Sequence, residues 1–78
     1  MRKREQITTL IEDYIEKYAK GEEVVLNVRE IRAWPAVDKL CANYNSLNIS
    51  NAMDAVKFQH GNGEGVHGSS TYTVKYSK

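Results

Sequence analysis

The stretch from Gly61 to Gly68 holds four glycines in eight residues, and it constrains the fold more than any other part of the chain. Glycine has few backbone restrictions, so a stretch this rich in it cannot sustain a helix. The residues on its two sides have different periodicities. A helical pattern precedes it and a strand pattern follows it, so the chain must pass from helix to sheet across a loop.

The strand pattern covers residues 71–76. Apolar and polar side chains alternate there, with Tyr72, Val74 and Tyr76 on one face, which is typical of a half-buried strand. Its expected partners are residues 64–67, reached through a turn at 68–70, and the short β-branched run 24–26. The sequence therefore predicts a small antiparallel sheet.

The first helix is predicted from about Arg4 to Lys20, with Gly21 as its stop. Its apolar side chains recur at helical spacing and are expected in the core: Ile7, Leu10, Ile11, Tyr14, Ile15 and Tyr18. Core packing explains this stripe better than a partner-binding face. The prediction for the N-terminal quarter of the chain is therefore one amphipathic helix.

The second helix is predicted to start after Asn27, which can cap it together with Glu30. Pro35 lacks an N–H group and should bend or split this helix near Ala33. A second piece would then run to about Tyr44, with Cys41 as a small buried apolar residue. We therefore expect a bent or two-piece helix.

The third helix is predicted from Ile49 to about residue 58, after a polar turn at 45–48. Its apolar side chains repeat at i, i+3, i+4 and i+7, in the order Ile49, Ala52, Met53 and Val56. Two helices joined by a polar turn form a helix-turn-helix. Trp34, beside Pro35, is expected to pack on the core rather than to stand out as an interface anchor.

Composition narrows the possible functions. The chain has 78 residues, with 11 Lys and Arg against 10 Asp and Glu, so its net charge is +1. We expect a single domain over residues 1–78, with a small core and no global field for nucleic acid or acidic lipid. Cys41 is the single cysteine, and no apolar run approaches the roughly 18 residues of a membrane span. The expectation is a soluble, cytoplasmic protein without a signal peptide and without membrane contact.

Catalytic and metal sites find little support in the sequence. The spacing of Cys41, His60, Glu64 and His67 matches no zinc pattern with two paired ligands. The glycine stretch is not a phosphate-binding fingerprint, because no strand leads into it and no helix follows it. The predicted protein is therefore not an enzyme, and no catalytic residue, metal or cofactor is expected.

The predicted order is helix, strand, helix, helix, strand, strand. In this order residues 5–76 resemble the winged-helix superfamily, and residues 41–56 can be laid on its helix-turn-helix. Ala42 takes the small position of the first helix, Ser46 the turn position, Leu47 the apolar residue after it, and Ala52 the apolar position of the recognition helix. Ser46 replaces the usual glycine, and Ala52 replaces the usual branched residue.

The resemblance implies an α+β winged helix-turn-helix, with three helices on a small antiparallel sheet and a glycine-rich wing. It also implies double-stranded DNA as partner, with helix 49–58 in the major groove and the wing, residues 61–70, on the backbone. The family's role in bacteria and archaea is transcriptional regulation. The wing's glycines have an equally good alternative explanation, a mobile loop without a ligand.

Candidate contacts follow from residue type. Asn can make a bidentate contact to adenine and Ser can bond base or phosphate, so Ser50 and Asn51 are the candidates for base contacts. Asn48 fits a helix cap better, and Asp54 would repel phosphate. The phosphate candidates lie on the third helix, on the wing and on neighbouring segments: Lys57, His67, Ser69, Ser70, Arg29 and Lys39.

Two partner hypotheses remain. The low charge of one subunit favours a homodimer, which would double the phosphate contacts and match a two-fold symmetric site. The alternative is a winged-helix module that binds protein and not DNA, since one fold hosts several functions. Trp34, Tyr44 or the wing would then dock the protein partner.

Overall fold

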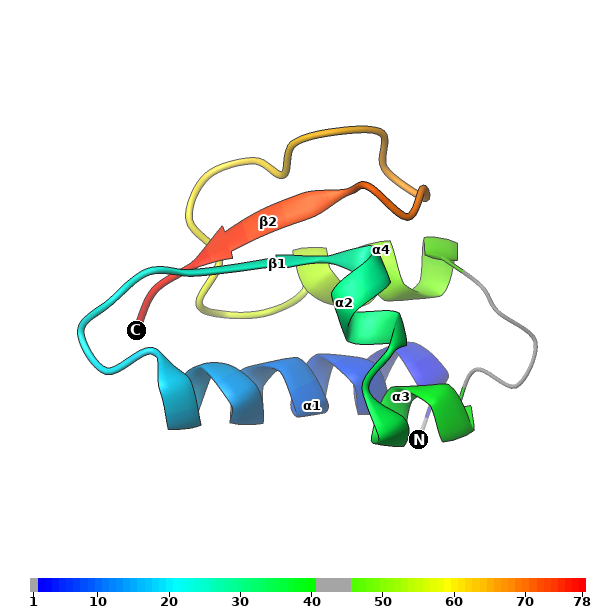
Figure 1. The fold of residues 1–78 in the computed structure, drawn as a ribbon, viewed down its shortest axis with the longest axis horizontal. Coiled ribbons are helices and arrows are strands. Elements are labelled where there is room, and N and C mark those ends of the chain that lie inside the picture. Colours follow the sequence, from blue (N-terminus) through cyan, green and yellow to red (C-terminus); the bar gives the residue numbers. More distant parts are fainter. Residues whose placement is uncertain (1, 41–45) are drawn as a thin grey trace.

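Helix α1 (Lys3–Tyr18) spans one side of the molecule in the computed structural model, which describes residues 2–40 and 46–78 (Figure 1). The described ranges form an α+β fold with four helices and a two-stranded antiparallel sheet. The remaining elements follow in the order β1 (Val24–Asn27), α2 (Val28–Arg32), α3 (Pro35–Leu40), α4 (Ser46–Asp54) and β2 (Thr73–Tyr76).

The buried face of α1 matches the apolar stripe of its sequence. Ile7, Ile11 and Ile15 are fully buried, and Ala19 continues the same row at the helix end. The prediction that Tyr18 belongs to the core is wrong, because its side chain is 53% exposed. Ala19 occupies the next core position, since it follows Ile15 by four residues and its N–H bonds the Ile15 carbonyl at 2.9 Å.

The predicted two-piece second helix is confirmed by α2 and α3. Asn27 caps α2, because its Oδ1 accepts from the Glu30 N–H at 2.8 Å. The helix ends at Arg32, and Pro35 begins α3, where its missing N–H costs no intrahelical bond. The Trp34 ring is partly buried against the core. The predictions for Cys41, Ala42 and Tyr44 lie outside the described residues.

The sheet pairs β1 with β2 in the predicted antiparallel sense, with Val24 opposite Tyr76 and Leu26 opposite Val74. The predicted strand at 64–67 is wrong. Glu64 alone bridges to Thr73 within that segment, because Gly65 has φ +85° and turns the chain out of the extended conformation. The segment 59–64 therefore runs along the outer edge of β2 with only isolated bridges, as the loop above β2 in Figure 1 shows.

Helix α4 is shorter and earlier than predicted, since it spans Ser46–Asp54 and not 49–58. Its last carbonyls bond side chains from distant elements. The Tyr76 hydroxyl donates to the Met53 carbonyl at 3.0 Å. Thr8 Oγ1 lies 3.3 Å from the Ala52 carbonyl and shares its proton with the Arg4 carbonyl, which is closer at 2.8 Å. Because these groups satisfy the helix end, the chain turns there while Val56 stays in the core.

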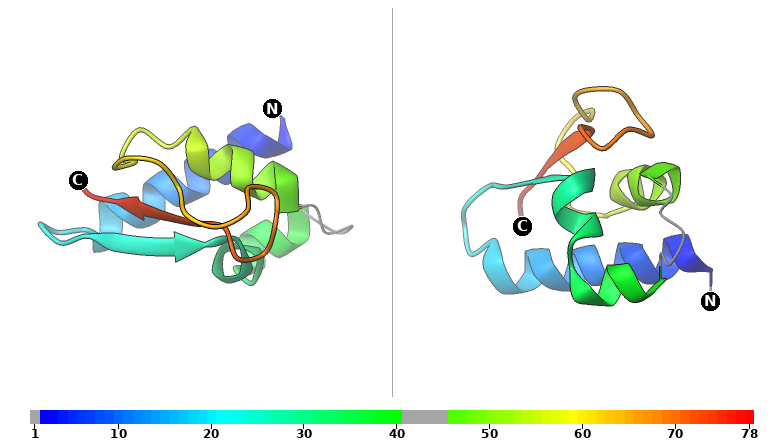
Figure 2. Two further views of the ribbon diagram at one scale, coloured as in Figure 1. Left: turned by 90° about the horizontal axis from the view of Figure 1, so that it is seen from above. Right: turned by 45° about the vertical axis from the view of Figure 1, so that its right-hand side comes forward.

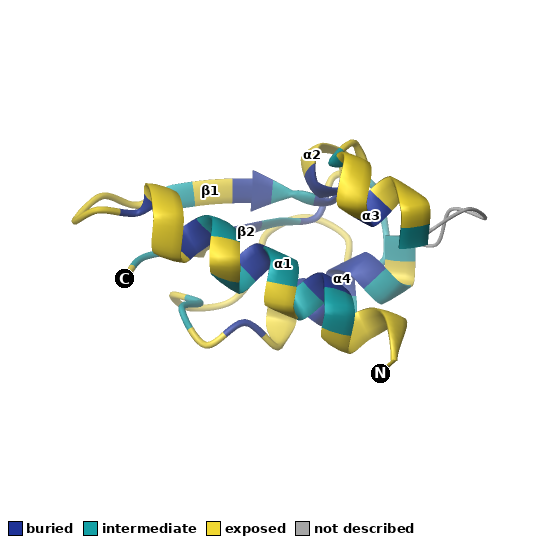
Figure 3. Cartoon of the chain, turned by 90° about the horizontal axis from the view of Figure 1, so that it is seen from below, coloured by how far each residue is buried: buried dark blue, intermediate teal, exposed yellow. Residues whose placement is uncertain are grey.

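The core lies between α1, α4 and the sheet. Figure 2 shows α4 crossing over α1 beside α2, and Figure 3 shows the buried positions of α1 and α4 turned toward one another. The sheet closes the core with the inward side chains of Leu26, Val74 and Tyr76, and Tyr72, just before β2, packs beside them. The opposite face of α4 is thus the part of this helix that a partner could reach.

Candidate nucleic-acid interface

Ser50 is not a surface residue of α4. It was expected to contact bases, but its side chain is fully buried. The Ser50 Oγ accepts a hydrogen bond from the Gly68 N–H at 3.0 Å. The prediction is therefore wrong for this residue, because its hydroxyl holds the glycine-rich segment against α4 instead of facing solvent.

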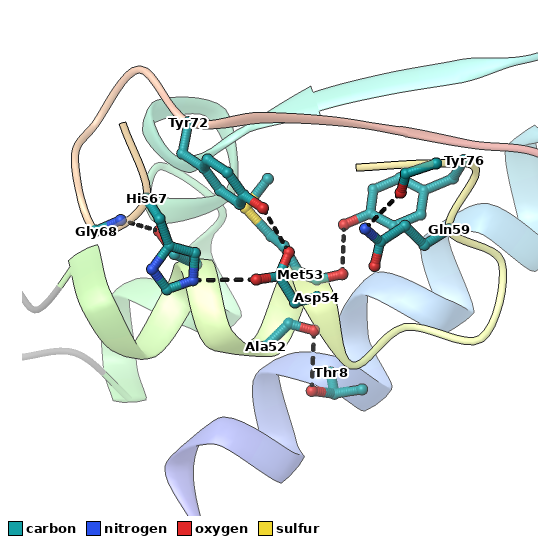
Figure 4. A network of polar contacts seen from close by, with 11 residues as sticks. Thr8, Ala52, Met53, Asp54, Gln59, His67, Gly68, Tyr72 and Tyr76 are labelled. Carbon is teal, nitrogen blue, oxygen red and sulfur yellow. Dashed lines mark hydrogen bonds and ion pairs between the residues drawn. The ribbon is translucent and has the colours of Figure 1, made fainter. Parts of the chain in front are cut away.

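Residues 66–70 form a turn that folds onto α4, and we refer to them as the docked loop. The Ser46 hydroxyl donates to the Gly68 carbonyl at 2.5 Å. The Asp54 carboxylate lies 3.0 Å from Nε2 of His67 (Figure 4). Ser46, Ser50 and Asp54 recur every four residues, so one stripe of α4 holds the whole loop.

Asp54 also accepts a hydrogen bond from the Tyr72 hydroxyl at 2.6 Å (Figure 4). The edge of the His67 ring packs on Tyr72, with 4.9 Å between the ring centroids. Burial raises the pKa of the Tyr72 hydroxyl to about 12, and the hydrogen bond to Asp54 adds to this shift. Tyr72 therefore stays a hydrogen-bond donor at neutral pH. The Asp54 carboxylate, which was expected to repel DNA phosphate, contacts His67 of the docked loop and Tyr72.

Gly63 has a packing role beside this cluster. A Cβ at this position would lie 2.2 Å from the Tyr72 hydroxyl oxygen, so only glycine lets the tyrosine ring pass. Two loop glycines are therefore required by the fold itself, without any ligand: Gly63 makes room for the Tyr72 ring, and Gly65 adopts a positive φ.

Asn51 remains at the surface of α4, where it is half-buried. Its neighbours one turn away on each side, Leu47 and Ala55, are exposed. Leu47 and Asn51 share one face of α4, because they are four residues apart, and Ala55 lies in the turn just after the helix. Asn51 is therefore the predicted base contact that the fold leaves accessible.

Three predicted phosphate contacts come together where the docked loop meets the start of α2: Arg29, Ser69 and Ser70. The Arg29 N–H donates to the Ser70 carbonyl at 3.2 Å, which places the start of α2 against the loop. Ser69 Oγ lies 2.9 Å from Thr71 Oγ1 and accepts from the Thr71 N–H. Among these three residues, Arg29 carries the permanent positive charge. His67, a fourth predicted phosphate contact, belongs to the same docked loop.

Lys57 and Lys39 lie elsewhere. The Lys57 N–H donates to Glu12 Oε2 at 3.1 Å, just beyond the other end of α4, and its exposed ammonium group lies 5.1 Å from the Phe58 ring centroid. Lys39 lines a groove between α1 and α3. The fold therefore joins Lys57 to the α4 region and leaves Lys39 apart from it.

Sequence reasoning missed Ser46, Asp54 and Tyr72 as the residues that fix the loop. The signal was available in part, since Ser46, Ser50 and Asp54 form a polar stripe beside the apolar stripe of the same helix. The spacing does not reveal that this polar stripe contacts His67 and Gly68 of the docked loop.

Within residues 2–40 and 46–78, no helix is long and apolar enough to cross a membrane. The same ranges contain no cluster of three or more His, Cys, Asp or Glu side chains that could hold a metal ion. Comparison with known proteins gave no matching family model, no matching curated protein and no matching solved structure. The functional argument therefore depends on the geometry of this chain.

Proposed function

We propose that this chain is a small winged-helix protein that binds double-stranded DNA and regulates transcription. The order of its elements supports the proposal: α4 lies across α1 and α2, and the chain then returns through a glycine-rich loop to β2, which pairs with β1. In this assignment α4 is the recognition helix and the docked loop is the tip of the wing.

The observation that carries the proposal is the solvent-facing side of α4. Asn51 lies there one turn after the exposed Leu47, with the docked loop on one flank of the helix. The major groove of B-DNA, about 12 Å wide, admits one α-helix, and Asn is suited to a bidentate contact with adenine. Asn51 therefore reads a base in this proposal.

Two groups of candidate phosphate contacts lie beside this helix. Arg29, Ser69 and Ser70 lie where the docked loop meets α2, and Lys57 lies just after the last residue of α4. Two cations per subunit give few phosphate contacts, so binding should be weak for a monomer. A homodimer doubles the contacts and fits a two-fold symmetric site.

The test is binding of the purified protein to random-sequence duplex DNA across a salt series. We expect affinity to fall steeply with salt, and Lys57→Ala or Arg29→Ala to reduce the slope of log K against log salt by about 1 each. Asn51→Ala combined with Lys57→Ala should weaken binding further. Lys20→Ala, at an exposed lysine beyond the end of α1, is the matched control and should bind like the unchanged protein. Slopes that change equally in all variants would contradict the assigned interface.

One observation favours a second candidate, a module that binds protein and not DNA. Leu47 is 51% exposed and Val66 is 71% exposed. Leu47 lies beside Gly68 of the docked loop, and Val66 begins that loop. Exposed apolar side chains of this kind are typical of protein contacts. Absence of duplex binding even at low salt would favour this candidate over the first.

A further inference from the structure

Strand β1 forms one edge of the sheet, and its outer side is open. The sheet consists of β1 and β2, and the segment 59–64 lies along the far side of β2. Figures 2 and 3 both show β1 at the margin of the molecule, with no other described element alongside the middle of the strand. An open strand edge carries N–H and C=O groups that a further strand can bond.

The hydrogen bonds of β2 show which groups of β1 point outward. The N–H and carbonyl of Thr73 and the carbonyl of Lys75 all bond the segment 59–64, at 2.7 to 2.9 Å. In an antiparallel ladder, successive residues alternate between bonding one neighbouring strand and the other. Thr73 and Lys75 therefore face away from β1, so their opposite residues, Asn27 and Val25, face away from β2. The N–H groups of Val25 and Asn27 and the Val25 carbonyl are thus open to a further strand.

These outward groups match a second copy of the same strand. Val25 presents a donor and an acceptor on one side, so two copies related by a two-fold axis at Val25 would exchange both bonds. In that register the Asn27 N–H lies opposite the Glu23 carbonyl of the second copy, because both residues are two positions from Val25. The two strands would therefore share two backbone bonds at Val25 and one from each Asn27.

The side chains of the outer face fit the same register. Val25 is 47% exposed, and it would lie beside Val25 of the second copy. Asn27 uses its Oδ1 to cap α2, which leaves its amide N–H groups as donors. The exposed carboxylate of Glu23 of the second copy lies opposite Asn27 on this face and can accept from it. Lys75 lies on the inner side of Val25 within its own chain, so no like charges face each other across the axis.

A second copy suits this edge better than an unstructured peptide. The open stretch is short because α2 begins at Val28, so any partner forms few hydrogen bonds there. An unstructured peptide must first lose chain entropy to become extended, whereas β1 of a second copy is already held extended by its own β2. The strand Val24–Asn27 also has no proline and no charged residue, which are common means of protecting an edge from pairing.

We propose that the chain forms a homodimer through antiparallel pairing of β1 with β1 of a second copy. The sheets of the two copies then join into one, with the two-fold axis at Val25. Seen from above, α4 lies on the other side of β2 from β1, so the pairing leaves α4 accessible (Figure 2). The pairing specifies the homodimer of the proposed function and rests on that proposal in this respect.

The test is sedimentation equilibrium of the full chain without DNA, at concentrations up to about 1 mM, where a dissociation constant of similar size gives comparable amounts of monomer and dimer. We expect the dimer fraction to rise with concentration. A monomer over the whole range would overturn the pairing, whatever the chain does with DNA. A dimer that does not bind duplex DNA would overturn the proposed function and leave the pairing intact.

Variants of Val25 test the edge. Val25→Lys places like charges next to each other at the axis and should weaken dimerisation by about tenfold or more. Val66→Lys makes the same change at an exposed valine outside β1 and should not. Val25→Pro removes an outward N–H without removing a bond to β2, so it should also weaken the dimer. Circular dichroism checks that the variants are folded. A folded Val25→Lys protein that dimerises like the unchanged chain would overturn the proposal.

Amide hydrogen exchange locates the contact independently. The N–H groups of Val25 and Asn27 should exchange more slowly as the protein concentration rises, because they become bonded across the axis. The N–H of Asn62, an exposed residue on the other side of the sheet, is the control and should exchange at a constant rate. A dimer without added protection at Val25 and Asn27 would overturn the assignment of β1 as its interface.

Discussion

The hydroxyl of Tyr72 donates to Oδ1 of Asp54 at 2.6 Å and thereby joins the residue just before β2 to the last residue of α4. The two residues are 18 positions apart in the chain, and the docked loop lies between them. His67 contacts the other carboxylate oxygen at 3.0 Å. One carboxylate therefore fixes both the loop and the strand that follows it.

Removing this carboxylate should loosen the loop. Asp54→Ala leaves the buried Tyr72 without its acceptor, so we expect the free energy of unfolding to fall by about 1–2 kcal/mol. Urea denaturation measures the change. Asp13→Ala, at an exposed position of α1, is the matched control and should change it little. Equal losses in both variants would show that the Asp54 contact adds nothing to stability.

Alkaline pH should destabilise the fold through Tyr72. Its pKa rises from 10 in the unfolded chain to about 12 in the folded protein, so the protonated hydroxyl is stabilised by folding. This stability is fully present below pH 10 and is lost as pH rises toward 12. Tyr72→Phe should therefore lose less stability than the unchanged protein over this range.

The comparison is made by urea denaturation at a series of pH values. Burial also raises the pKa of Tyr76, so the variant should flatten the pH dependence only in part. Tyr18→Phe, at an exposed ring, controls for a lost hydroxyl and should retain the full dependence. The same dependence in Tyr72→Phe and Tyr18→Phe would count against the role of Tyr72.

Gly63 should tolerate no side chain. A Cβ there would meet the Tyr72 ring, and Tyr72 is held in place by Asp54, so Gly63→Ala should cost about 1–3 kcal/mol. Thermal unfolding reports the loss. Asn62→Ala changes the exposed neighbour and should leave the midpoint nearly unchanged. An unchanged unfolding midpoint in Gly63→Ala would show that the Tyr72 ring does not lie close to the backbone of Gly63.

Ser50 should matter for stability and not for DNA contact. Ser50→Ala leaves the Gly68 N–H without its acceptor, so we expect a loss of about 1 kcal/mol and faster amide hydrogen exchange at Gly68. Asn51→Ala is the control, with slow exchange at Gly68 retained. Unchanged exchange at Gly68 in Ser50→Ala would contradict the loop contact.

Several features of this fold followed from neighbouring residues alone. The spacing of Ile7, Ile11 and Ile15 predicts the buried face of α1, since a helix repeats every 3.6 residues whatever surrounds it. Asn27 caps α2 within three residues, and Pro35 separates α2 from α3 through its missing N–H. These effects act within one turn, so they are visible in the sequence.

The candidate site was predictable only in part. Asn51 was placed on the surface of α4 by spacing, and the structure keeps it there. Ser50 was placed beside it for the same reason, yet it is buried. The difference arises because Gly68, 18 residues later, brings its N–H onto the Ser50 hydroxyl. The periodicity of α4 cannot predict this contact, because Gly68 lies outside the helix.

The sequence by itself determined the buried face of α1, the pairing of β1 with β2, the cap at Asn27, and the point where Pro35 separates α2 from α3. The tertiary structure decided where α4 ends, which of its polar residues are covered, and that the segment 64–67 is not a strand. The physical reason is the origin of the hydrogen-bond partners. Tyr76 satisfies the Met53 carbonyl near the end of α4 from 23 residues away, and such a partner exists only once the whole chain has folded.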